Sequence, residues 1–318
     1  MVNHPFRSKR DGFLLLYPFF FYTLEETKIL KAGILFLLLV QVLFYPSLQS
    51  QNSTSAIKDI VYGETGSRKL LLDLYMPSGK KDPFLIIWIH GGAWRSGSKE
   101  SPPLGMLPYG YALASLDYRM SEEAIFPSAI FDIKAAIRFL RANAKKYGYR
   151  PDKIIVWGSS SGGHYAALIG TTNNDKYFEG NIGNYLNESS SVQAALDFYG
   201  PSDFLTILDQ STPHGISVRV PALTLLLGKP VEQVPELAKK ASPVFQVDST
   251  DAPMFIVHGD QDNQVPVNQS LELMAAYKKN NLKYRLEIIS GAGHGGEAYN
   301  KKELMEKMDK FLAEVLTK

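Results

Sequence analysis

Residues 154–164 of this chain read Ile154-Ile155-Val156-Trp157-Gly158-Ser159-Ser160-Ser161-Gly162-Gly163-His164, and this stretch decides the fold. Three apolar residues lead into a Gly-x-Ser-x-Gly arrangement centred on Ser160. The pattern predicts a buried strand, a sharp turn and a helix, with the central serine strained so that its hydroxyl stands clear of the sheet. Glycines suit the flanks because a Cβ there would collide with the neighbouring strand or helix. Glycine and serine are common, so the motif is weak without its position and its distant partners.

The composition is that of an ordinary globular protein. The chain has 318 residues, of which 45% are hydrophobic and 21% charged, and its formal net charge is +2. Residues 1–50 hold five of the 34 basic and three of the 32 acidic residues, so the remainder has 29 of each and no net charge. This balance excludes a basic nucleic-acid-binding surface, and the remaining length suffices for one large α/β domain.

The first 50 residues are predicted to be a leader. Residues 28–50 combine a basic flank, a short apolar run and small residues at a plausible cleavage site, which is typical of a secretory signal peptide. We expect cleavage near Ser50 and a mature chain from about Gln51, because the apolar run is shorter than the ~20 residues of a spanning helix. An uncleaved membrane anchor is the alternative. Residues 1–27 hold a second apolar stretch, which indicates either a long leader or a start codon assigned too far upstream.

The chain contains no cysteine. This excludes disulfides, a thiolate nucleophile, a cysteine-ligated metal and a lipid-modified cysteine at the cleavage site. We expect neither a cofactor nor a metal ion.

From residue 56 onward, short apolar runs alternate with helical patterns, which predicts a mostly parallel sheet covered by helices on both faces. Strands are expected at 69–76, 84–89, 111–116, 154–157, 194–199, 254–257 and 284–289, and helices at 126–147, after Ser161 and at 302–316. Residues 201–245 lose the alternation and contain several prolines. They are predicted to form a small helical lid insertion within a single catalytic domain, 51–318.

A serine hydroxyl needs a base to take its proton and a carboxylate to orient that base. His294 is the favoured base among six histidines, because it lies in the glycine-rich loop 290–296 after the last predicted strand. Asp260 and Asp262 both follow the strand at 254–257, and their spacing leaves the choice between them open. All these candidates come just after strands, at the edge of an open α/β sheet where active-site crevices form, and in the order serine, acid, histidine.

A transition-state oxyanion needs preorganised N–H donors. One candidate is the backbone N–H of Ser161, directly after the nucleophile. The others lie in the loop after the strand at 84–89, where Gly92 is the best candidate and Gly91 or Ala93 would assist. Trp94 in the same loop is expected to contact the substrate, although structural packing explains it equally well.

These residues resemble the α/β-hydrolase superfamily and, within it, the esterase and lipase branch related to hormone-sensitive lipase. More narrowly, the chain is similar to exported bacterial feruloyl and acetyl-xylan esterases. The similarity covers roughly residues 56–316 and includes 73–77, 90–97, 116–121, 126–129 and 198–203. The resemblance implies that Asp262, the aspartate that precedes Val265-Pro266 in the family motif, is the catalytic acid rather than Asp260.

Two features depart from this family. Ser159 and Ser161 stand where the family often has an acidic residue and an alanine. Long N-terminal cap helices are missing, so the site is expected to be open and to suit a bulky decorated polysaccharide.

The expected function is a serine carboxylic-ester hydrolase with an acyl-enzyme intermediate, which removes acetyl or feruloyl groups from plant polysaccharide such as xylan. The alternatives are an amide hydrolase of the arylformamidase type, a serine peptidase, and an inactive hydrolase fold used as a binding module. The expected partner is the ester substrate, with no nucleic acid and no stable membrane span after cleavage. The sequence does not indicate an oligomeric state.

Overall fold

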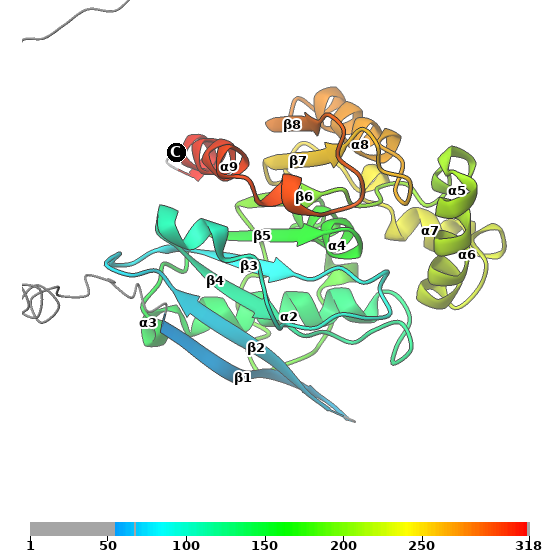
Figure 1. Ribbon diagram of the computed structural model, residues 1–318. Helices are drawn as coiled ribbons and strands as arrows, with labels where there is room; N and C mark the ends of the chain where they lie inside the picture. Colours follow the sequence, from blue (N-terminus) through cyan, green and yellow to red (C-terminus); the bar gives the residue numbers. More distant parts are fainter. Residues whose placement is uncertain (1–54, 67, 317–318) are drawn as a thin grey trace, which may run out of the picture. The chain divides into compact units, whose positions relative to one another are not determined.

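The computed structural model describes residues 55–66 and 68–316, in which eight strands form one sheet in the order β1-β2-β4-β3-β5-β6-β7-β8. Figure 1 shows this order from β1 at the bottom to β8 at the top. The first two pairings, β1 with β2 and β2 with β4, are antiparallel, and the remaining pairings are parallel. The strands are β1 (Ser55–Thr65), β2 (Arg68–Met76), β3 (Phe84–Ile89), β4 (Tyr111–Leu116), β5 (Ile154–Ser159), β6 (Ala194–Phe198), β7 (Met254–Gly259) and β8 (Tyr284–Ile289).

The central strands are apolar on both faces because helices cover both sides of the sheet. All six residues of β4 and all five of β6 are buried, as expected for strands of an α/β sheet. One core layer contains side chains of α2 (Ser128–Ala142), α4 (Ser161–Gly170) and α8 (Asn268–Lys279). The other contains side chains of α9 (Lys302–Leu316) and of the 3-10 helix η1 (Leu104–Tyr109). The mostly parallel α/β fold predicted from the sequence is confirmed.

The predicted helix at 126–147 is two helices. α2 ends at Ala142 and α3 (Ala144–Tyr147) follows Asn143, whose N–H bonds back to the carbonyl of Phe139. The apolar face of α2 is as expected, since Ile130, Ile133 and Ile137 are completely buried. The sequence analysis predicted neither α8 nor the edge strand β1, which is mostly exposed and interrupted by register shifts. Such interruptions are common in edge strands, where they hinder pairing with other chains.

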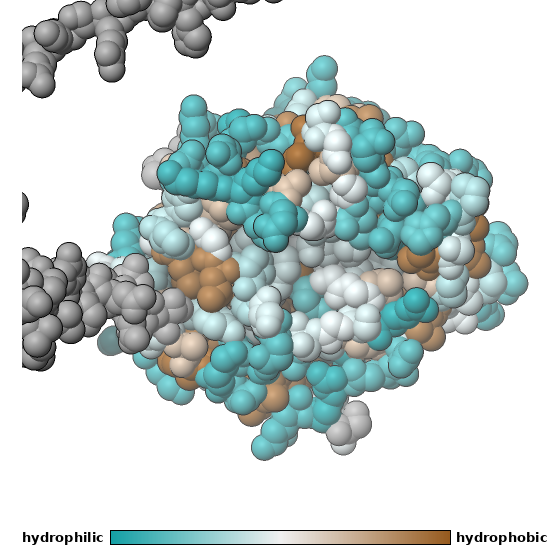
Figure 2. Space-filling model, viewed as in Figure 1, coloured by the Kyte–Doolittle hydropathy of each residue, from teal (hydrophilic) through white to brown (hydrophobic). Residues whose placement is uncertain are grey.

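The segment between β6 and β7 contains the predicted helical insertion, with α5 (Ile207–Gln210), α6 (Pro213–Leu227) and α7 (Pro235–Ala241). Figure 1 shows these helices at the right, beyond the arrowheads of β3 and β5. Thr212 caps α6 by accepting a hydrogen bond from the Gly215 N–H, and Pro213 follows in the first turn, where its missing donor is not needed. Figure 2 shows apolar surface over this group, in which Ile216 and Val220 of α6 are exposed.

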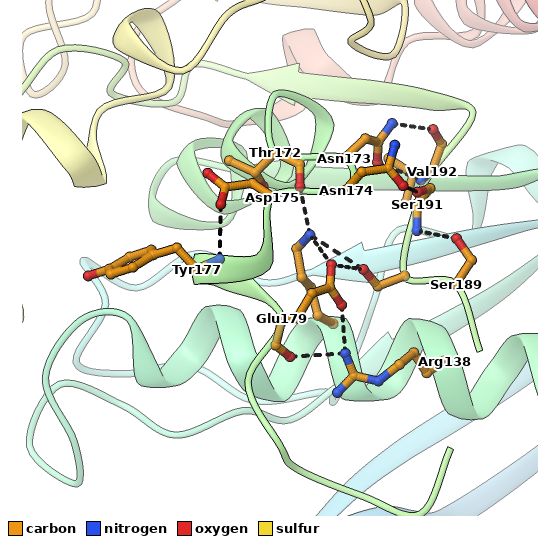
Figure 3. Close-up of polar contacts among 12 residues, drawn as sticks. Arg138, Thr172, Asn173, Asn174, Asp175, Tyr177, Glu179, Ser189, Ser191 and Val192 are labelled. Carbon is orange, nitrogen blue, oxygen red and sulfur yellow. Dashed lines mark hydrogen bonds and ion pairs between the residues drawn. The ribbon is translucent and has the colours of Figure 1, made fainter. Parts of the chain in front are cut away.

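A buried charge cluster fastens the long connection between α4 and β6 to α2. Lys134 is fully buried, and its ammonium donates to the Thr172 carbonyl at 2.8 Å and to a Glu179 carboxylate oxygen at 3.0 Å. Arg138 donates to the other carboxylate oxygen of Glu179 at 2.9 Å, and Ser190 to the first at 2.6 Å. Figure 3 shows the side chain of Glu179, from this connection, beside Arg138 of α2. One carboxylate therefore pairs with both cations that α2 places in the interior.

No helix within the described part of the chain has both the length and the apolarity needed to cross a bilayer. The predicted signal peptide lies outside the described residues.

We expect Glu179→Gln to lower the free energy of unfolding by about 2–3 kcal/mol, because Lys134 and Arg138 would remain buried without a counter-charge. Burial alone would raise the pKa of Glu179, but the hydrogen bond from Ser190 and the charge of Lys134 hold it below its ordinary value of 4.5. The stabilisation is therefore complete above pH 4.5 and is lost as the pH falls below it. Urea denaturation at pH 7 and pH 4 measures both effects.

Glu188→Gln is the matched control for this measurement, since Glu188 is exposed on the same connection and the charge change is identical. We expect its effect to remain within about 0.5 kcal/mol. Equal losses in the two variants would contradict a specific role of the cluster.

Candidate active site

The turn between β5 and α4 holds Ser160 in a backbone conformation that serine rarely adopts, with φ 55° and ψ −122°. Close backbone packing imposes this conformation. A Cβ on Gly162 would lie 2.0 Å from the Ile89 carbonyl oxygen, and one on Gly158 would lie 2.0 Å from the Gly162 oxygen. Only glycine fits at either position, so β5 and α4 approach closely enough to force the turn. Such strain typically costs about 1–3 kcal/mol and is characteristic of functional sites.

Ser160, His294 and Asp262 form a continuous hydrogen-bonded series. The His294 Nε2 lies 2.8 Å from the Ser160 Oγ, and the His294 Nδ1 lies 2.6 Å from the Asp262 Oδ2. With the imidazole neutral and protonated on Nδ1, the ring donates to the carboxylate and accepts from the hydroxyl. Ser160 lies in the turn after β5, Asp262 in the loop after β7 and His294 in the loop after β8. The structure therefore brings together the side chains that were predicted to converge.

The surroundings of Asp262 keep this carboxylate ionised. Its Oδ1 accepts hydrogen bonds from the backbone N–H groups of Gln264 and Val265 at 2.8 and 2.9 Å. Burial alone would raise the pKa of Asp262, but hydrogen bonds from His258 and His294 and from these amides hold it well below its usual range. His258 is completely buried, and its Nε2 lies 3.3 Å from the Asp262 Oδ2. A neutral acid at this position is therefore excluded near neutral pH.

Asp260 occupies a different environment from Asp262. It is exposed, and its carboxylate accepts a hydrogen bond from the Gly291 N–H at 2.7 Å. This contact joins the loop after β7 to the start of the loop that carries His294. Asp262, rather than Asp260, contacts the imidazole.

The loop after β3 lies against the nucleophile turn. A Cβ on Gly91 would lie 2.8 Å from the Ser159 carbonyl oxygen and 3.3 Å from the Ser160 Cβ, so this backbone is next to the reactive hydroxyl. Gly92, Ala93 and Trp94 all have positive φ, at 122°, 53° and 61°. The Tyr118 hydroxyl supports the loop by donating to the His90 carbonyl at 2.6 Å.

Ser161 begins α4, where the first backbone N–H groups have no partner within the helix. Its amide and the glycine loop both lie next to Ser160, as expected of oxyanion donors.

Trp94 does not line the site, so the predicted contact of Trp94 with the substrate is wrong. Its side chain is completely buried, and the indole N–H donates to the His164 Nδ1 at 3.1 Å. The His164 Nε2–H donates in turn to the Ala241 carbonyl of α7 at 2.7 Å. Burial lowers the pKa of His164 to about 4, so the ring is neutral at physiological pH. Trp94 thus connects the glycine loop to the insertion.

Ser160 and His294 open on a pocket of about 350 Å³, to which the insertion contributes Arg219. Tyr199 forms part of its wall, and its ring centroid lies 4.9 Å from that of His294. A second cavity of about 650 Å³ shares Ser159 and Tyr199 with the first. Its lining is rich in aromatic residues, among them Trp88, Trp157, Phe198 and Tyr299.

Arg219 and Tyr199 were missed by the sequence analysis. Arg219 had a detectable signal, because it is the one Asp, Glu, Lys or Arg within the mostly apolar helix Pro213–Leu227. Tyr199 had none, since an aromatic residue at the end of a buried strand reads as core. Among the described residues, no group of three or more His, Asp or Glu side chains has the arrangement of a metal site.

Comparison with known proteins yields consistent similarities. The model of the family described as BD-FAE matches residues 72–277. The chain is 32% identical to "Esterase LipC" of Mycobacterium tuberculosis over 74% of this chain and 59% of that protein. It therefore spans somewhat more than half the length of this curated relative.

Two solved structures are similar over most of the described fold. A truncated carbohydrate esterase from gut microbiota is 34% identical with a TM-score of 0.77, covering 85% of this chain and 99% of that one. An acetyl ester-xyloside bifunctional hydrolase from Caldicellulosiruptor lactoaceticus is 26% identical with a TM-score of 0.66, covering 81% and 96%.

Proposed function

We propose that this chain, which belongs to the BD-FAE family of the α/β-hydrolase superfamily, is a serine carboxylic-ester hydrolase with Ser160, His294 and Asp262 as its catalytic triad. The observation that carries the proposal is the hydrogen-bonded series from the Ser160 hydroxyl through His294 to the buried Asp262 carboxylate. Relatives and structural neighbours described as esterases support the same reaction.

In the proposed mechanism, the Ser160 Oγ attacks the ester carbonyl while the His294 Nε2 takes its proton. The Asp262 carboxylate stabilises the imidazolium. Backbone N–H groups of Gly91, Gly92 and Ser161 bind the oxyanion of the tetrahedral intermediate. The imidazolium returns the proton to the leaving alcohol, and an acyl-enzyme remains. Water, deprotonated by His294, then attacks the acyl carbon, and collapse of the second intermediate releases the acid and restores Ser160.

The two aspartates provide a matched test of the triad. We expect Ser160→Ala to reduce ester hydrolysis to background, and Asp262→Asn to lower kcat by about 10³–10⁴-fold because His294 loses the acceptor that sets its tautomer. Asp260→Asn removes the same charge two residues away and should retain activity within about threefold, because Asp260 bonds to the loop residues Gly291, Gln261 and Ser290 and not to the imidazole. Initial rates on p-nitrophenyl acetate measure all three variants.

Equal rates for Asp260→Asn and Asp262→Asn would contradict the assigned acid. Full activity of Ser160→Ala would contradict Ser160 as the nucleophile, whereas no ester hydrolysis by the wild-type protein would support a hydrolase fold used only for binding.

For the substrate, we propose acetyl or feruloyl esters of plant polysaccharide such as xylan. The printed descriptions of the structural neighbours, a carbohydrate esterase and an acetyl ester-xyloside hydrolase, support this class. The aromatic cavity beside Tyr199 supports it as well, because aromatic faces suit either a sugar ring or an aromatic acyl group. The Trp157 indole N–H there is buried without a hydrogen-bond partner and could donate to a substrate oxygen.

We expect the protein to release acetate or ferulate from native xylan and to prefer short p-nitrophenyl esters over those with more than about eight acyl carbons, because the pocket at Ser160 holds only about 350 Å³. Product release is measured by chromatography. A strong preference for long chains would indicate a lipase, and faster hydrolysis of N-formyl anilides than of acetate esters would indicate the amide hydrolase.

We also propose that the chain is exported, on the basis of the signal-peptide pattern at 28–50. Fractionation of expressing cells should place the processed protein in the periplasm or medium, with a mature N-terminus near Gln51. Full-length protein in the cytoplasm would contradict export, and full-length protein in membranes would indicate the uncleaved anchor.

A further inference from the structure

Arg219 of α6 has unused hydrogen-bonding capacity beside the nucleophile. Its side chain is 1% exposed, and it lines the same pocket of about 350 Å³ as Ser160 and His294. The Nη1 is buried and has no hydrogen-bond partner. The Nε makes one long contact, 3.4 Å, to the Gln264 carbonyl, and the guanidinium lies 5.8 Å from the centre of the Trp94 ring.

A buried guanidinium is normally matched by a carboxylate, because an unpaired charge in the interior is expensive. No carboxylate lies within ion-pair distance of Arg219 in the part of the chain that the structure describes. The nearby Asp262 affects Arg219 only through its charge, and the oxygens of Asp262 accept from His294, Gln264 and Val265. Burial lowers the pKa of Arg219 to about 10, so the group remains a cation at neutral pH.

The other charged residue among those that line the pocket is also positive. Arg95, from the glycine loop, also lines it and is exposed, and no Asp or Glu among the described residues does so. Two arginines thus line the pocket that contains the nucleophile, one from the loop after β3 and one from the insertion. A low-dielectric pocket with this lining attracts anions and disfavours cations.

We propose that Arg219, assisted by Arg95, binds a carboxylate that the ester substrate carries beside its scissile bond. The inference rests on the proposed esterase function and narrows its substrate class. Arginine suits this task because its planar guanidinium donates to both oxygens of a carboxylate. The carboxylate has two possible sources. It belongs either to a uronic acid on the alcohol side or to a dicarboxylic half-ester on the acyl side.

The alternative role for Arg219 is structural, as a prop between Trp94 and the loop that contains Gln264. That role uses the Nε and the face of the guanidinium and leaves the Nη1 unsatisfied. It also predicts that substitution affects charged and neutral substrates alike. A role in substrate binding predicts instead that substitution of Arg219 lowers kcat/KM more for a charged substrate than for a neutral one.

Two pairs of substrates separate these roles and the two sources. On the alcohol side, a mono-O-acetyl methyl glucuronoside is compared with the corresponding glucoside. On the acyl side, p-nitrophenyl hemisuccinate is compared with p-nitrophenyl butyrate. We expect the wild-type protein to prefer the anionic member of one pair by at least tenfold in kcat/KM, mainly through a lower KM. The preference should weaken from 20 mM to 500 mM salt because added ions screen the charges.

Arg219→Gln should reduce this preference at least tenfold, and Arg219→Lys should retain part of it, because the charge remains but the bidentate geometry does not. Arg150→Gln is the matched control, since Arg150 is exposed before β5 and lines no part of this pocket. It should keep both the preference and the rate. Titration of Ser160→Ala with glucuronate, succinate and glucose supplies a measurement that needs no turnover, and the acid matching the preferred pair should bind more tightly than glucose.

A wild-type protein with no anionic preference in either pair, or equal losses on both members in Arg219→Gln, would overturn the proposal. Should Arg219→Gln not fold, the wild-type ratios, their salt dependence and the Ser160→Ala titration decide the outcome. Hydrolysis of neutral esters without anionic preference refutes this inference alone. Absence of any ester hydrolysis refutes the proposed function itself.

Discussion

The close approach of β5 and α4 is the constraint on which the remainder of the site depends. Gly158 and Gly162 allow the two backbones and the end of β3 to come within contact distances that no side chain would permit. The resulting turn forces Ser160 to φ 55° and presents its hydroxyl to the loops after β7 and β8. The same approach sets the glycine loop after β3 against the nucleophile, because Gly91 lies over the Ser159 carbonyl.

The acid and the base are supported by loops that bond to one another. Asp260 fastens the base of the His294 loop through Gly291, while the neighbouring Asp262 contacts the imidazole. The His258 Nδ1 is hydrogen-bonded to the Ser270 hydroxyl of α8, and the His258 Nε2 lies next to the Asp262 carboxylate. Asp262 therefore has a buried polar partner, His258, and the loop that carries His294 has an exposed one, Asp260, neither of which takes part in the proposed chemistry. Such support limits the motion of the imidazole and the carboxylate.

The insertion is part of the site rather than a detached cover. α7 accepts a hydrogen bond from His164, which receives the Trp94 indole N–H from the glycine loop. α6 places Arg219 over Trp94 and into the pocket. A change in the position of these helices would therefore alter both the pocket charge and the support of the glycine loop. The insertion, whose sequence pattern is the least regular, therefore affects the proposed substrate class through the charge of Arg219 in the pocket.

Sequence alone determined the features that local chemistry imposes: the apolar strands, the amphipathic face of α2 and the glycine-flanked turn at Ser160. Family resemblance, rather than spacing, distinguished Asp262 from Asp260, because both residues lie within three residues of the end of β7. Tertiary structure alone decided the rest. The burial of Trp94, the register-shifted edge strand β1 and the unpaired Arg219 all depend on which surfaces meet across the fold. The periodicity of a segment predicts the secondary structure of that segment alone. The partner of a buried polar group comes from a segment far away in the chain, as with Trp94 and His164, which are 70 residues apart.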